Sequence, residues 1–131
     1  MKESIFIVCE DDAPTLKMYR NLLRRKKVAS QNVFCFEDGT LAIKLIQDLT
    51  SNQVFLLTDF NMPNTNGGLV LQAAIEKGIP YKIIRSGIPK SRLSKILEDD
   101  YSIEDEVVIY DKLDSMRLIS EQIDEFLRVE C

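Results

Sequence analysis

The feature that most constrains this chain is an alternation, repeated five times, between short apolar runs typical of strands and longer amphipathic runs typical of helices. Strands that alternate with helices of this length predict a parallel sheet covered by helices on both faces. Right-handed crossovers leave few topologies for such a (βα)5 chain, and 131 residues are enough for one domain with a sizeable core. The five strands are expected at residues 4–9, 33–36, 54–59, 81–86 and 107–110.

Capping and turn residues set the expected ends of the helices. Asp12 is placed as the N-cap of the first helix, and Pro14 occupies its first turn. Gly78, followed by Pro80, ends the third helix. The helices are expected at residues 14–27, at 40–50, from the end of the 63–67 loop to 77, at 89–99 and at 113–129. The apolar residues expected to face the core from the second and the last helix are Leu41, Leu45, Ile46, Leu49, Met116, Ile119, Ile123, Phe126 and Leu127.

The composition excludes several classes of function. A net charge of −4 disfavours non-specific binding to nucleic acid or to an acidic membrane surface. No apolar run approaches the ~20 residues that span a bilayer, and no signal peptide is recognised, so we expect a cytoplasmic protein. The chain has no histidine, which removes Ser–His and Cys–His nucleophiles. Chemistry must therefore depend on carboxylates, lysines and hydroxyls.

Polar residues that could take part in catalysis or binding lie at or just after the C-terminal ends of four of the five predicted strands. Glu10 and Asp11 follow the first strand, Asp59 ends the third, Ser86 ends the fourth, and Lys112 follows the fifth. Because the C-terminal ends of parallel strands meet at one edge of a sheet, these side chains are expected to converge. Each residue alone has an ordinary explanation as a cap, a turn hydroxyl or a surface lysine.

Convergence of three carboxylates has an electrostatic consequence. Two carboxylates ~4 Å apart repel by roughly 4 kcal/mol at an effective dielectric constant near 20, so such a cluster needs a proton or a cation. Oxygen ligands suit a hard cation, and Mg²⁺ is usually held by one or two carboxylates together with water or phosphate. With the ammonium of Lys112 on the other side, Asp59 is expected to receive a phosphoryl group as a nucleophile. The Ser86 hydroxyl could then bond a phosphate oxygen.

At this point the sequence resembles the response-regulator receiver domain of two-component signalling, over essentially its whole length. The resemblance lies in the acidic run within residues 8–14, in Asp59-Phe60-Asn61-Met62-Pro63 with Gly67 beyond it, in residues 83–87, and in Asp111-Lys112. It implies a flavodoxin-like fold with strand order 2-1-3-4-5 and a single receiver domain over residues 1–131. No output domain is expected within these residues, and whether the chain is a stand-alone receiver or part of a longer protein stays open.

The resemblance also implies a role for each site residue. Asp59 is the expected phosphoacceptor, supplied by the phosphohistidine of a sensor kinase or a histidine phosphotransfer protein. Lys112 is expected to pair with the phosphoryl group, and Ser86 to turn toward it. The expected Mg²⁺ contacts are direct from Asp11 and Asp59, through water from Glu10, and through the backbone carbonyl of Asn61. Beyond Mg²⁺-dependent phosphorylation and dephosphorylation of Asp59, no enzyme activity is expected.

Partners are expected on two surfaces. The helix at residues 14–27 is the expected docking element for the phosphodonor, and its basic end could assist there. The surface of the fourth helix, fifth strand and fifth helix is the expected contact for a downstream protein. The acidic residues near that surface are either a solvated loop or a docking edge for a basic partner. They are Glu98, Asp99, Asp100, Glu104, Asp105 and Glu106.

Two positions depart from the family's pattern. Leu113 follows Lys112 where that family usually has a proline after a cis bond, and a cis bond before any other residue costs ~3 kcal/mol. Ile109 stands where the family has an aromatic residue, and Tyr110, one place later, should face the other side of the sheet. These departures keep open a degenerate receiver that binds partners regardless of phosphate. A metal-dependent phosphatase is a third hypothesis, but such enzymes carry an acid/base aspartate where this chain has Asn61.

Overall fold

The computed structural model describes residues 4–50, 53–104, 107–112 and 115–130. Within these residues, strands and helices alternate along the chain, and a short 3-10 helix at Ser30–Asn32 precedes the second strand. The strands form one parallel sheet in the order β2-β1-β3-β4-β5, so the predicted fold class and strand order are confirmed. The strands are β1 Ile5–Cys9, β2 Val33–Phe36, β3 Val54–Asp59, β4 Tyr81–Ser86 and β5 Val108–Asp111.

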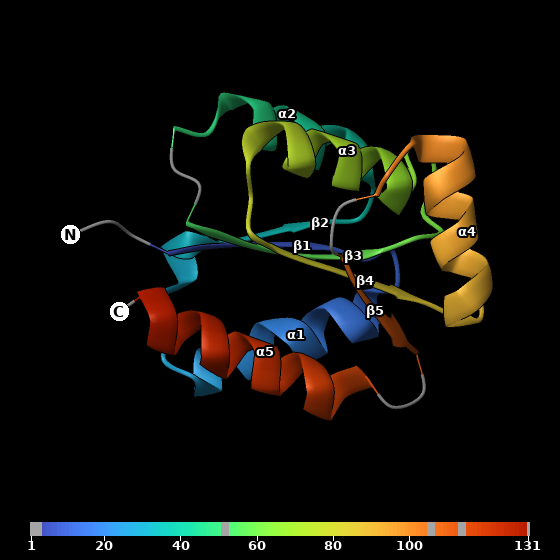
Figure 1. The fold of residues 1–131 in the computed structure, drawn as a ribbon. Helices are drawn as coiled ribbons and strands as arrows, with labels where there is room; N and C mark the ends of the chain where they lie inside the picture. Colours follow the sequence, from blue (N-terminus) through green and yellow to red (C-terminus); the bar gives the residue numbers. More distant parts are fainter. Residues whose placement is uncertain (1–3, 51–52, 105–106, 113–114, 131) are drawn as a thin grey trace.

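Helices cover both faces of the sheet, as Figure 1 shows. Helices α2 and α3 lie on one face, α1 and α5 lie on the other, and α4 lies at the end of the sheet beside β5. Among the described residues, every helix is too short or too polar to cross a membrane. The helices are α1 Ala13–Arg25, α2 Gly39–Asp48, α3 Gly67–Lys77, α4 Lys90–Tyr101 and α5 Ser115–Glu130.

Two predicted helix caps are confirmed, whereas α1 and α2 each end two residues before the predicted end, at Arg25 and at Asp48. The Asp12 carboxylate accepts a hydrogen bond from the amide of Thr15 at 3.1 Å and so starts α1. Gly78 ends α3 in the left-handed conformation, with φ of 77°, which a residue without a Cβ adopts at little cost. Helix α4 continues two residues past the predicted end at residue 99, and β5 is shifted one residue toward Lys112. The predicted start of the last helix at Leu113 lies outside the described residues.

The apolar residues form two cores, one on each face of the sheet. Ile109 belongs to the core under α2, α3 and α4, whereas Tyr110 packs on the opposite core under α1 and α5. The prediction that these neighbours face opposite sides is therefore confirmed. On α5, Ile119, Ile123 and Phe126 are buried as predicted, and the Phe126 ring meets Phe6 edge-on at 5.3 Å.

The prediction for the buried face of α2 is wrong at Leu41, whose side chain is 63% exposed. Ile46 is fully buried as predicted, and the fully buried residue one helical turn before it is Ala42. At the start of the helix, Gly39 lies so close to α3 that an added Cβ would come within 2.6 Å of Val70 Cγ2. This close approach turns the small Ala42 inward and leaves Leu41 outside, while Leu45 and Leu49 are partly buried against the core.

Candidate functional site

Three carboxylates meet at the C-terminal edge of the sheet, where the strand order places β1 beside β3. Glu10 and Asp11 follow β1, Asp59 is the last residue of β3, and one carboxylate oxygen from each of the three lies within 4.8 Å of the other two. Glu10 and Asp59 are buried, whereas Asp11 is exposed. The predicted convergence of these acids is therefore confirmed. We call the three residues the acid cluster.

Lys112 supplies a cation to one side of Asp59. Its Nζ donates to Asp59 Oδ2 at 3.0 Å, and the lysine side chain is 40% exposed. The other carboxylate oxygen of Asp59, Oδ1, is buried and has no hydrogen-bond partner among the described residues. A buried anionic oxygen in that state is costly unless a ligand or a cation contacts it.

A second cation, Arg85, was not predicted. It lies next to Asp59 in the register of β3 and β4, and its Nη1 donates to Glu10 Oε1 at 3.2 Å. Its Nη2 donates to the backbone carbonyl of Lys112 at 3.1 Å, and its guanidinium carbon lies 5.8 Å from the centre of the Tyr19 ring. A signal for it exists in the sequence, because a charge directly after the apolar pair Ile83-Ile84 in a buried strand needs an internal partner.

Glu10 has partners for both of its oxygens. Oε1 accepts from Arg85, and Oε2 accepts from the amide of Asp12 at 3.3 Å. Burial raises the pKa of Glu10 to about 7, and the negative charge of Asp59 adds to the shift. Arg85 acts in the opposite direction, since a nearby cation favours the charged carboxylate. The raised pKa therefore reflects first the burial of the Glu10 carboxylate and only second its closeness to Asp59.

Comparison with known proteins points to one fold. No protein-family model matches the sequence, and no curated protein matches it either. Solved structures match over nearly the whole chain. A response regulator receiver protein from Sinorhizobium medicae WSM419 has a TM-score of 0.74 and 15% identity, with 97% of this chain and 96% of that chain covered. The chain has the receiver-domain fold.

Two further solved structures agree with this result. A CheY-like response regulator receiver domain from Methanospirillum hungatei JF-1 has a TM-score of 0.71 and 15% identity over 98% of both chains. The BeF3-activated DrrB receiver domain has a TM-score of 0.69 and 16% identity over 97% of this chain and 99% of that chain. At these identities the likeness establishes the receiver-domain fold, and function must be argued from the site.

Two other predicted site residues lie at the same edge of the receiver-domain fold. Ser86 is the buried last residue of β4, and its Oγ accepts from the amide of Ile88 at 3.0 Å. Asn61 is exposed in the loop after β3. The predicted contacts of Ser86 with phosphate and of Asn61 with a cation stay predictions. The bond between Lys112 and Leu113 lies outside the described residues.

The acid cluster fits a hard divalent cation. All three side chains offer oxygen atoms, which Mg²⁺ prefers, and Asp59 Oδ1 is a buried oxygen without a hydrogen-bond partner in the described part of the chain. Asp11 and Asp59 are the residues suited to direct contact, because both oxygens of Glu10 already have hydrogen-bond donors. The donor set therefore fits the Mg²⁺ that the sequence predicted.

The loop after Asp59 depends on close backbone packing at Gly67, the first residue of α3. The Gly67 amide donates to the carbonyl of Phe60 at 2.8 Å, and a Cβ added at this glycine would collide with the carbonyl oxygen of Asp59. Gly67 therefore brings the start of α3 against the backbone of Asp59.

Substitution Gly67→Ala should lower the free energy of unfolding by about 2–3 kcal/mol, because a methyl group facing fixed backbone cannot be accommodated by rotating a side chain. Urea denaturation monitored by far-ultraviolet circular dichroism measures this change. Gly87→Ala is the matched control, since an added Cβ there meets nothing within 4 Å. Equal stability of the two variants would show that the loop has room at Gly67.

Proposed function

We propose that this chain is a response-regulator receiver, which accepts a phosphoryl group on Asp59 from a partner's phosphohistidine and then signals through protein–protein contacts. The observation that carries the proposal is the environment of Asp59. Oδ2 of this buried carboxylate lies 3.0 Å from the Lys112 ammonium, and one of its oxygens lies within 4.8 Å of an oxygen of Glu10 and of an oxygen of Asp11. The receiver-domain fold supports the same role.

The proposed reaction transfers one phosphoryl group. An oxygen of Asp59 attacks phosphorus, the phosphorus–nitrogen bond of the donor breaks, and the imidazole leaves with the electron pair and takes up a proton. Lys112 stabilises the negative charge on the phosphoryl oxygens as they approach Asp59. When bound by Asp11 and Asp59, Mg²⁺ supplies further positive charge for those oxygens. The donor histidine lies outside these 131 residues, because they contain none.

Ser86 and Asn61 complete the proposed site. The Ser86 hydroxyl now accepts from Ile88, and a rotation about its single side-chain torsion would let it donate to a phosphate oxygen instead. Asn61 offers its backbone carbonyl to the cation. Its amide side chain cannot shuttle a proton as an aspartate would, so turnover of an external phosphoester is not expected. The activity proposed is confined to phosphorylation and dephosphorylation of Asp59.

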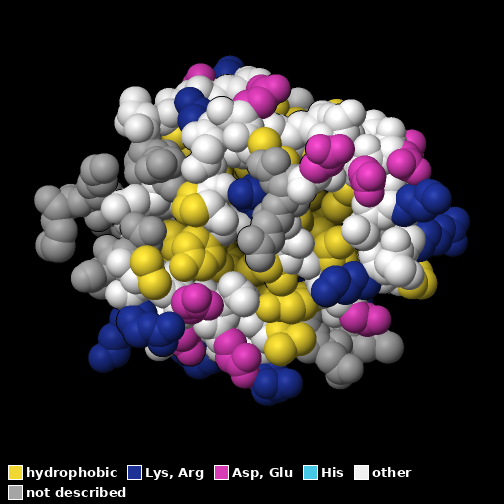
Figure 2. Space-filling view, in the orientation of Figure 1, with side chains coloured by type: hydrophobic (Ala, Val, Ile, Leu, Met, Phe, Trp, Pro, Cys, Tyr) yellow, Lys and Arg dark blue, Asp and Glu magenta, His cyan; other side chains and the backbone are white. Residues whose placement is uncertain are grey.

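The downstream partner is proposed to bind the surface of α4, β5 and α5. Figure 2 shows acidic side chains gathered where α4 ends. Of the acidic residues singled out in the sequence, Glu98, Asp99, Asp100 and Glu104 are exposed, and Asp105 and Glu106 lie outside the described residues. Exposed charges of one sign favour a partner of opposite charge, so a basic surface is the expected complement.

The degenerate receiver is the second candidate, and one observation favours it. Ile109 is an aliphatic residue in the core under α2, α3 and α4, and Tyr110 faces the opposite core. Strand β5 therefore presents no aromatic ring on the face of the sheet to which Ser86 belongs. A receiver of this kind would bind its partner equally well as wild type and as Asp59→Asn. A partner affinity that depends on phosphorylation of Asp59 excludes it.

Incubation with Mg²⁺ and a small phosphodonor tests the proposed function. Intact-protein mass spectrometry should show the gain of one phosphoryl group, and Asp59→Asn should abolish it. Asp48→Asn, an exposed aspartate on α2, is the matched control and should leave the gain unchanged. Absence of a mass gain in the folded wild-type protein would argue strongly against the proposal. Beryllofluoride offers an independent probe, since the DrrB receiver domain was solved in a BeF3-activated form.

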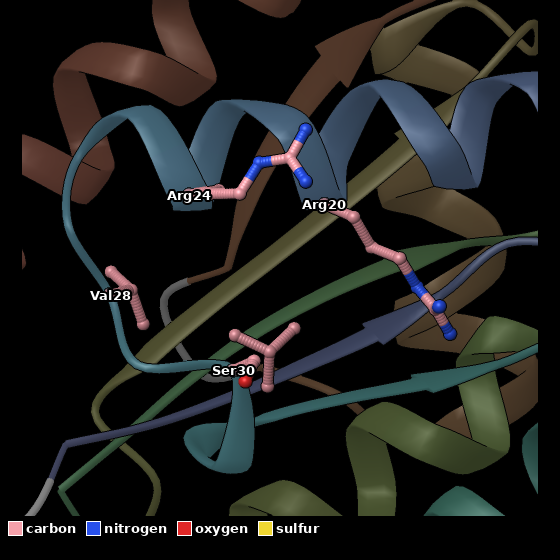
Figure 3. A pocket seen from close by; sticks show the side chains of 5 residues that line it. Arg20, Arg24, Val28 and Ser30 are labelled. Carbon is pink, nitrogen blue, oxygen red and sulfur yellow. The ribbon is translucent and has the colours of Figure 1, made fainter.

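The basic end of α1 is proposed to assist docking of the histidine donor. Arg20 and Arg24 line a cavity of about 430 Å³ together with Val28, Ser30 and Val33, as Figure 3 shows. This cavity lies at the sheet edge opposite Asp59, because α1 ends and β2 begins there. A donor helix that lies along α1 would reach both the acid cluster and these arginines.

Charge reversal at Arg24 and Arg25, both exposed, should slow phosphotransfer from a histidine-protein donor by roughly ten-fold at low salt, because steering between opposite charges is lost. Phosphorylation by a small phosphodonor should keep its rate, since it needs no docking surface. Mass spectrometry of samples quenched at successive times measures the rate of phosphorylation with each of the two donors. An unchanged rate with the protein donor removes the basic end of α1 from the docking surface.

A further inference from the structure

Arg85 is a cation enclosed within the site. Its side chain is only 14% exposed, although arginine is rarely enclosed unless it is paired. Its contacts with described residues include Glu10 after β1, the carbonyl of Lys112 after β5, and the ring of Tyr19 on α1. A planar guanidinium fork can make such divergent contacts at once, whereas a lysine ammonium is a point charge.

These contacts fix where the positive charge lies. The three carboxylates of the acid cluster are accompanied by two cations, Lys112 at Asp59 and Arg85 at Glu10. When the three carboxylates are ionised, these five groups together carry one net negative charge, and without Arg85 they would carry two. Arg85 and the Asp12 amide also occupy both oxygens of Glu10, which leaves Asp11 and Asp59 as the direct donors.

We propose that Arg85 is the internal counter-ion of the acid cluster. It stabilises the cluster before a divalent cation binds, keeps Glu10 out of direct coordination, and lowers the affinity of the site for that cation. The inference rests on the cation site of the proposed function, and it adds a positioning residue to that site. Arg85 acts through Glu10 and the Lys112 backbone, and it neither accepts nor transfers the phosphoryl group.

Substitution Arg85→Met tests the inference in two measurements on the full chain at pH 8. The melting temperature without metal should fall by about 5 °C, because a buried carboxylate loses its partner. The dissociation constant for Mg²⁺, from isothermal titration calorimetry, should tighten by on the order of ten-fold, because one repelling charge is removed. Arg85→Lys keeps the charge and should bind Mg²⁺ as the wild type does. Arg92→Met, which removes an exposed charge on α4, should change neither quantity.

The double variant Glu10→Gln/Arg85→Met keeps the test decisive if Arg85→Met is too unstable to titrate. Removing both partners should recover most of the lost melting temperature, because the uncompensated charge is gone. An Arg85→Met protein with unchanged or weaker Mg²⁺ affinity, or a double variant no more stable than Arg85→Met, would overturn the role of Arg85. A wild-type protein that binds no Mg²⁺ would overturn the cation site itself and this inference with it.

Discussion

Replacement of Lys112 by alanine is expected to slow phosphorylation of Asp59 by roughly 10²–10³-fold, because a cation positioned for developing charge contributes about that much to catalysis. The Lys112 Nζ lies 3.0 Å from Asp59 Oδ2, within reach of a phosphoryl group carried on that oxygen. The fold should survive with a lowered melting temperature, because the buried Asp59 carboxylate loses its ammonium partner, while the 40% exposed lysine leaves room for water to replace part of that contact. The rate of mass gain with a small phosphodonor and Mg²⁺ measures the effect.

Two variants separate the role of Lys112 from a general loss of charge. Lys44→Ala removes an exposed lysine on α2 and should phosphorylate at the wild-type rate. Lys112→Arg keeps the charge but replaces a compact ammonium by a planar fork, so it should recover only part of the rate. If Lys112→Ala reacted as fast as the wild type, the proposed arrangement of the reaction would be wrong, even though the ion pair exists.

The acid cluster and Lys112 could be predicted from the sequence because two simple rules combine there. A strand-like run that ends in a carboxylate places Asp59 at a sheet edge, and the order of parallel strands brings Glu10 and Asp11 to the same edge. Neither rule needs side-chain detail. The capping of α1 by Asp12 was predictable for the same reason, since the cap and its partner Thr15 are three residues apart.

The partners of Arg85 and the exposure of Leu41 could not be predicted by such rules. The partners of Arg85 lie 75 and 27 residues away in the sequence, and strand alternation alone does not say which carboxylate a buried arginine meets. Leu41 was misplaced because helical spacing fixes a buried stripe only to within about one residue. The choice between Leu41 and Ala42 is made by the close packing of Gly39 against Val70, which is a tertiary contact.

Substitution Asp59→Asn should stabilise the metal-free protein, by about 1–2 kcal/mol or several degrees in melting temperature. The carboxylate is buried, lies within 4.8 Å of two other acids, and has one oxygen without a hydrogen-bond partner among the described residues. Losing the pair with the partly exposed Lys112 offsets little of this gain. Thermal unfolding in a chelating buffer at pH 8 measures the difference, with Asp48→Asn as an exposed control.

Mg²⁺ should stabilise the wild-type protein more than Asp59→Asn, because its charge offsets the repulsion among the acids of the cluster. At a concentration near 100 times its dissociation constant, a cation that binds only the folded site stabilises the wild type by about 2.7 kcal/mol. Asp59→Asn should lose most of that response, because its amide carries no charge for the cation, so the order of stability of the two proteins should reverse in Mg²⁺. This reversal distinguishes a charge cluster that binds a cation from a packing defect at Asp59. If Asp59→Asn only relieved a packing defect, the variant would melt at a higher temperature than the wild type both with and without Mg²⁺. Parallel responses of the two proteins would mean that the acids are neighbours without forming a cation site.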